Sequence, residues 1–124
     1  MPQIQRPLSG VPLHFCLNEA QRPYHIDEAL LARAGRSART LLKEGPLRVT
    51  LIALAPGGEL AQHRADGPIT VQVLRGEMRF QVGEETWALQ AGDLLSLGAS
   101  IPHAVHSESG AEFLLTVASQ RGPG

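Results

Sequence analysis

The stretch PGGELAQHRADGPITVQVLRGEMRF, residues 56–80, decides how this chain folds. It opens on a glycine turn, reaches a histidine at His63, and continues into an alternating apolar run through Val71 and Val73. Apolar residues at every second position are typical of a β-strand with one buried face. A second glycine, Gly76, then indicates a tight turn before the next alternating run. The stretch therefore predicts short strands joined by turns, with a histidine at the end of one strand.

The same rhythm continues on both sides of this stretch. Short runs of strand-forming residues alternate with turn sequences such as EGP, DGP, GEE and SESG. About nine strands are expected, at residues 37–43, 47–55, 60–64, 69–74, 77–82, 86–89, 94–97, 103–106 and 112–118. No second helix interrupts them, so the pattern predicts an antiparallel β-sandwich or barrel.

The first third of the chain has a different pattern. A single helical segment is indicated within residues 18–34, where Asp27 is placed to cap its amino end and Gly35 to stop it. The expected organisation is an arm and helix at residues 1–36, the barrel at 37–118, and a tail at 119–124.

Composition excludes several classes of partner. The 124 residues suit one domain with its own core, and a formal net charge of −1 without a basic run gives no sign of nucleic-acid binding. No apolar run approaches the roughly 20 residues of a membrane span, and the N-terminus lacks a signal-peptide pattern. Cys16 is the one cysteine, which fits a reducing compartment, and its apolar surroundings indicate packing. A cytoplasmic protein is expected, with no membrane or nucleic-acid partner.

The spacing of glycines and histidines resembles that of the cupin family, which carries two short motifs. In the first motif a glycine is followed by His-x-His, a glutamate and a second glycine. Here Gly57, His63 and Gly76 match the motif. Ala65 and Ile69 stand at the positions of the second histidine and the glutamate.

The second motif is also matched in part. Gly92 opens it and His103 stands at its histidine position, while Ser107 replaces the family's asparagine. The resemblance covers residues 37–118. It implies an all-β fold, an antiparallel jelly-roll β-barrel with one short N-terminal helix. It also implies that the family's four ligand positions fall at residues 63, 65, 69 and 103, of which two have lost their donor atoms.

The candidate site therefore lies inside the barrel. His63 and His103 are the candidate metal ligands, and together with Ile69 and Val71, which share a strand face, they form the candidate ligand pocket. Metal sites usually need three or four protein ligands. Two histidines are therefore expected to hold a divalent ion (zinc, iron, nickel or manganese) only weakly.

Other interpretations of these residues stay open. A third ligand could come from a loop, from Asp66, Glu59 or Gln62. The two histidines could instead be neutral structural side chains hydrogen-bonded to the backbone. His106 should point away from the face of His103, toward the surface or a subunit interface.

Two functional classes follow. The first is a binding or sensing domain that holds a small molecule in an apolar barrel, with a weakly bound metal. The second is a metal-dependent enzyme of the dioxygenase or isomerase type, in which the metal acts as Lewis acid and template. The first is favoured because half of the ligand set is missing. The apolar run at 47–55 is hard to cover within one barrel, so a homodimer is also expected.

Overall fold

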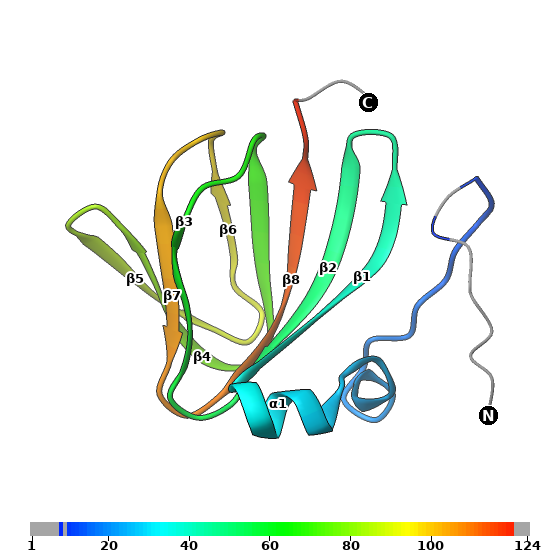
Figure 1. Ribbon diagram of the computed structural model, residues 1–124, viewed down its shortest axis with the longest axis horizontal. Helices are drawn as coiled ribbons and strands as arrows, with labels where there is room; N and C mark the ends of the chain where they lie inside the picture. The colour runs from blue at the N-terminus through cyan, green and yellow to red at the C-terminus, as the bar shows by residue number, and fades with distance from the viewer. Residues whose placement is uncertain (1–7, 9, 121–124) are drawn as a thin grey trace.

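The computed structural model describes residue 8 and residues 10–120 of the chain, which curl into a half-barrel built from one antiparallel sheet (Figure 1). Its described strands are β1 (Arg36–Glu44), β2 (Leu47–Leu54), β3 (Gly58–His63), β4 (Ile69–Val82), β5 (Glu85–Gln90), β6 (Leu94–Leu97), β7 (His103–Ser107) and β8 (Ala111–Ala118). The sheet order is β1-β2-β8-β4-β7-β3, and β5 and β6 both pair with β4. The expected all-β antiparallel jelly roll with one short N-terminal helix is confirmed.

Strand β4 differs from the sequence prediction. A turn was expected at Gly76, but the strand continues through it from Ile69 to Val82. A register shift between Val73 and Arg75 bends the strand, and Gly76 adopts a φ of 83°. A Cβ at Gly76 would lie 2.2 Å from the carbonyl oxygen of Gly110, so the glycine permits a close backbone approach. A β-bulge and a turn share the same glycine signal, and here the bulge is formed.

The predicted helix is shorter than its sequence window. Helix α1 covers Glu28–Ala34, and a 3₁₀ turn, η1, covers Arg22–His25. Asp27 caps α1 as expected, since its Oδ1 accepts a hydrogen bond from the backbone N–H of Leu30 at 2.9 Å. Gly35 ends α1 in the left-handed conformation, with φ 79°. The helical window from residue 18 thus contains two separate helical segments, because the chain is extended at Ile26, between η1 and this cap.

The hydrophobic core lies on the inner face of the curled sheet. Its buried members are Ile52, Leu54, Ile69, Val71, Val73, Met78, Phe80, Leu89, Val105, Ala111, Phe113 and Val117. They come from β2, β4, β5, β7 and β8, so the inward positions of consecutive strands meet in one cluster. Burial of these apolar side chains is the main source of the fold's stability.

The outer face of β2 is also buried at one end. Leu51 and Ala53 are each 1% exposed, although their neighbour Ile52 points into the core. Ala53 lies opposite Ser37 on β1 and Glu112 on β8. Both of these partners form hydrogen bonds to residues 22–27, which places the N-terminal segment over this face. Burial of this end of β2 therefore needs no second subunit.

A buried ion pair fixes this N-terminal segment. Arg22 is 5% exposed, and its Nε donates to Glu112 Oε1 at 2.5 Å. Its Nη1 donates to the carbonyl oxygen of Leu17 at 2.7 Å. The other carboxylate oxygen of Glu112 lies 3.1 Å from Nε of Arg75, on β4. One buried carboxylate thus links the N-terminal segment to two strands of the sheet.

Cys16 lies on the surface, so the prediction that it packs was wrong. Its neighbours Phe15 and Leu17 are partly buried, while His14 and Cys16 are exposed. An extended segment alternates its side chains in this way, and the thiol falls on the solvent side. Among the described residues, no helix is long and apolar enough to cross a membrane.

Candidate metal and ligand site

His63 and His103 lie side by side on the inner face of the sheet. They are opposite one another on β3 and β7, and their ring centroids are 4.3 Å apart with the ring planes at 62°. Val105, two residues after His103, belongs to the core, so these side chains face the interior. His103 is 3% exposed, whereas His63 is exposed.

An irregularity in β3 gives His63 this orientation. Leu60 lies opposite Val105 and packs against the core, so it faces inward. In a regular strand the residue three positions later would face outward. The register shifts between Leu60 and His63, and this shift turns the histidine to the inner face beside His103.

Both imidazoles are held in the same tautomer by the backbone. Nδ1 of His63 lies 2.9 Å from the carbonyl oxygen of Ala61, and Nδ1 of His103 lies 3.0 Å from that of Ile101. A carbonyl oxygen only accepts, so Nδ1 carries the proton and donates it. In each neutral ring the lone pair is then on Nε2, on the far side from its own strand. Metal-binding histidines typically have their second nitrogen fixed in this way.

The surroundings of His103 favour its neutral form. Its ring stacks on Phe80, with centroids 5.1 Å apart and planes at 13°. Burial lowers the pKa of His103 below the usual histidine value. The hydrogen bond to Ile101 opposes this shift, and the nearby His63 adds a smaller lowering. A lone pair on Nε2 of His103 is therefore available at neutral pH.

The geometry suits two ligands on one ion. A metal–nitrogen bond is about 2.0–2.1 Å long, so two imidazoles on one ion have ring centres roughly 4.5–5 Å apart. The observed 4.3 Å requires only a small opening of the pair. The residues present thus fit a divalent ion as a two-nitrogen donor set, without the third or fourth protein ligand of a tight site.

The two acidic residues considered as a third ligand do not join the histidine pair. The carboxylate of Asp66 accepts a hydrogen bond from Ser119 Oγ at 2.9 Å. Glu59 lies opposite His106, on the outer face of β3, and Gln62 is exposed. In the part of the chain that the structure describes, no group of three or more His, Cys, Asp and Glu side chains could hold a metal.

The other candidate pocket residues are part of the core. Ile69 is 3% exposed and Val71 is 1% exposed, and both belong to the buried cluster. Ala65 is partly buried and packs against that cluster. These three residues make the interior apolar but offer no donor atom. Whether they contact a ligand stays a prediction.

Two open depressions are lined by outer-face residues together with a few core side chains. One lies over β4, β5 and the end of β7 and includes His106, which is exposed as expected. The other lies over the ends of β4, β6 and β8. The first depression was not predicted from the sequence. Alternation alone could place its polar residues on the outer face, but only the strand register shows which of them meet.

The comparison with solved structures agrees with this architecture. A conserved protein of unknown function from Streptococcus pyogenes matches with a TM-score of 0.70 at 21% identity, over 97% of this chain and 100% of that one. A cupin superfamily protein from Desulfitobacterium hafniense matches with a TM-score of 0.66 at 18% identity, over 68% of this chain and 78% of that one. An HTH_3 family transcriptional regulator from Vibrio cholerae matches with a TM-score of 0.63 at 21% identity, over 70% of this chain and 52% of that one.

These identities establish similarity of fold rather than of activity. No curated protein matches the sequence significantly. The sequence profile of the cupin domain, however, matches residues 50–118, more than half of the chain, and this range includes both histidines. The chain therefore belongs to the cupin family.

Proposed function

We propose that this cupin domain binds a small molecule inside its half-barrel, at a site formed by His63 and His103. The observation that carries the proposal is the pairing of two imidazoles on one face, with their ring centroids 4.3 Å apart. Each donates its Nδ1 proton to the backbone, so each keeps an Nε2 lone pair for a ligand. His63 is exposed, so a dissolved ligand can reach its Nε2 atom.

A divalent ion is the partner that best fits two such lone pairs. His63 and His103 would each contribute one Nε2 atom, and the open positions on the ion would take water or the small molecule. When bound, the ion would act as a Lewis acid that attracts an oxygen of that molecule. With two protein ligands the ion should bind weakly, and mild chelation should remove it with little loss of folding stability.

The surroundings indicate how the small molecule would lie. His63 is exposed and His103 is 3% exposed, so a ligand would approach from the side of His63. Phe80 stacks on His103. Trp87, on β5, lies opposite Phe80 on the same face of the sheet and is 39% exposed. A molecule with an oxygen donor at one end and a flat or apolar body fits such surroundings.

A binding or sensing role is favoured over an enzyme for two reasons. Among the described residues, no third His, Cys, Asp or Glu joins the two imidazoles as a metal ligand, so the set is smaller than the three protein ligands of a typical catalytic metal site. In addition, one protein of similar fold is a transcriptional regulator, and a cupin domain in that setting is compatible with sensing.

Metal titration with matched histidine variants tests this function. Metal-stripped protein would be titrated with zinc, nickel and manganese chlorides by calorimetry near neutral pH. His63→Gln and His103→Gln should each weaken binding at least about tenfold, because each removes one of two ligands. His106→Gln, on the outer face, is the control and should bind as the wild type does. Equal binding by all four proteins, with the fold intact, would refute the site.

We also propose that the partner of this chain is a second copy of itself. The outer face of β2, β8, β4 and β6 carries the uncharged row Val49, Thr116, Thr70 and Ser96, each opposite the next. Leu94, on β6, is 65% exposed on this same face, and Leu47 is 39% exposed. Because this row of four residues carries no charge, two copies that meet along it about a two-fold axis would not place like charges against one another.

A further inference from the structure

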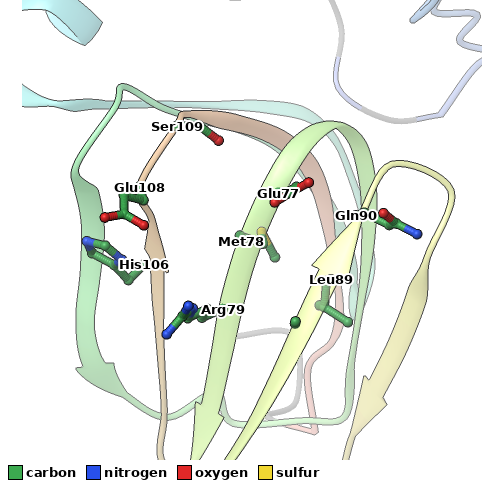
Figure 2. Close-up of a pocket in the computed structure, with 9 residues that line it drawn as sticks. Glu77, Met78, Arg79, Leu89, Gln90, His106, Glu108 and Ser109 are labelled. Atoms are coloured by element: carbon green, nitrogen blue, oxygen red, sulfur yellow. The ribbon is translucent and has the colours of Figure 1, made fainter.

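The depression over β4, β5 and the end of β7 has a volume of about 400 Å³ (Figure 2). It lies on the opposite face of the sheet from the two interior histidines. Arg79 and His106 are opposite neighbours and both are exposed, whereas the adjacent pair, Phe80 and Val105, is buried in the core. A ligand held by Arg79 and His106 would therefore lie on the other face of the sheet from the two interior histidines, while Met78 and Leu89 of the core line the floor of the depression.

Charges of both signs surround this depression. Figure 2 shows His106 and Glu108 on one side, Gln90 on the other, and Glu77 and Arg79 between them on β4. In the described part of the chain, the side chains of Arg79, His106, Glu77 and Glu108 form no hydrogen bond or ion pair. Four ionisable groups thus line one depression without neutralising one another.

A hydrogen bond fixes the two strands, β4 and β7, that carry these side chains. Ser107 is 0% exposed, and its hydroxyl donates to the backbone carbonyl of Glu77 at 2.6 Å. This bond ties β7 to β4 directly beneath the charged side chains. Glu77 and Arg79 are two residues apart on one strand face, about 6.6–7 Å along the strand, so a small molecule can bridge them.

We infer that this depression binds a small zwitterion of the α-amino-acid class. Arg79 offers a planar pair of donors that matches a carboxylate, and His106 lies beside it as a further donor. Glu77 and Glu108 offer acceptors to an ammonium group. A purely anionic ligand would meet two like-charged carboxylates, and a purely cationic one would meet Arg79. A molecule that carries both charges satisfies all of these groups.

The test uses binding to the full chain. The twenty standard amino acids would be screened by ligand-observed NMR, and each one that binds would be titrated by calorimetry. Its N-acetylated and amidated forms, which each lack one charge, should bind at least about tenfold more weakly. Arg79→Gln should weaken binding by about 10- to 100-fold, since it removes a charge-assisted carboxylate contact. Glu77→Gln combined with Glu108→Gln should weaken it similarly.

Two controls separate this site from the rest of the molecule. Arg48→Gln changes an exposed arginine on β2, and it should leave binding unchanged. His63→Gln should also leave it unchanged, because the inference does not depend on the interior site. Absence of binding by every amino acid, equal binding of the one-charge analogues, or wild-type affinity in Arg79→Gln would each overturn it. Loss of binding in His63→Gln would do the same, by placing the ligand inside the barrel.

Discussion

Replacing Arg22 by alanine should destabilise the protein strongly, although Arg22 lies outside the barrel strands. Arg22 is 5% exposed, and its guanidinium joins the carbonyl of Leu17 to the carboxylate of Glu112, 90 residues away in the sequence. Arg22→Ala removes both contacts. It leaves Glu112, which is 8% exposed, with Arg75 as its remaining ion-pair partner among the described residues.

The size of the effect follows from these contacts. Breaking a buried ion pair by removing one partner typically costs about 3–5 kcal/mol, because a buried charge is left without compensation. Here Arg75 still lies 3.1 Å from the second oxygen of Glu112, but its side chain is 50% exposed and compensates only in part. The expected loss in the free energy of unfolding is therefore about 2–4 kcal/mol, a large share of the roughly 5–15 kcal/mol of a typical domain.

Urea unfolding followed by circular dichroism would measure this loss. Arg75→Ala is the matched control and should cost only about 0–1 kcal/mol, because it removes the exposed half of the same network. In Arg22→Ala combined with Glu112→Ala, the cost should be smaller than the sum of the single changes, since no carboxylate remains buried. If Arg22→Ala costs no more than Arg75→Ala, the N-terminal segment is not held by this ion pair.

Three further predictions concern the site and the assembly. In metal-free protein, stability should fall as the pH drops below about 6.5, the usual value for an unfolded histidine, because burial lowers the pKa of His103 in the folded state. Urea unfolding at several pH values should show a shallower fall in His103→Gln, and an unchanged fall would contradict the assignment. Ala65→His combined with Ile69→Glu should raise divalent-metal affinity at least about tenfold by adding two ligands. Without metal, the free energy of unfolding of the same protein should fall by roughly a few kcal/mol, because Ile69 is 3% exposed and Ile69→Glu would bury a carboxylate there. Calorimetry would measure the metal affinity, and melting with and without metal would measure the stability. Unchanged affinity with an intact fold would mean that positions 65 and 69 do not face the histidines. Light scattering should give the molar mass of a dimer for the wild-type protein. Leu94→Glu should give the mass of a monomer, because it places a carboxylate from each copy at the proposed contact. A monomeric wild type would refute the interface.

The fold could be predicted from the sequence because its signals are local. Alternating apolar residues between glycine turns determined most strand positions, and Asp27 and Gly35 determined the ends of the one helix. Gly76 was misinterpreted because a positive φ serves a turn and a bulge equally well. The bulge is formed in place of a turn because Gly76 packs against Gly110, a contact between segments far apart in the sequence.

The candidate site could be predicted only in part, for the same reason. Motif spacing brought His63 and His103 together, but the face of His63 depends on a register shift that no local pattern reveals. The depression beside Arg79 and His106 depends on which outward residues of three strands meet. Likewise, the hydrogen bonds that place residues 22–27 over one end of β2 are long-range contacts, and strand hydrophobicity alone suggested a second subunit there instead.

The central claim is that His63 and His103 present two Nε2 lone pairs to one interior site. Long-range proton–nitrogen NMR of the histidine rings tests it most directly, with assignments from His63→Gln and His103→Gln. At a pH of about 8, where neutral imidazole dominates, both rings should appear as Nδ1–H tautomers. Added zinc should then shift both Nε2 resonances while leaving those of His106 unchanged. An Nε2–H tautomer in either ring, or Nε2 resonances that zinc does not move, would contradict the account.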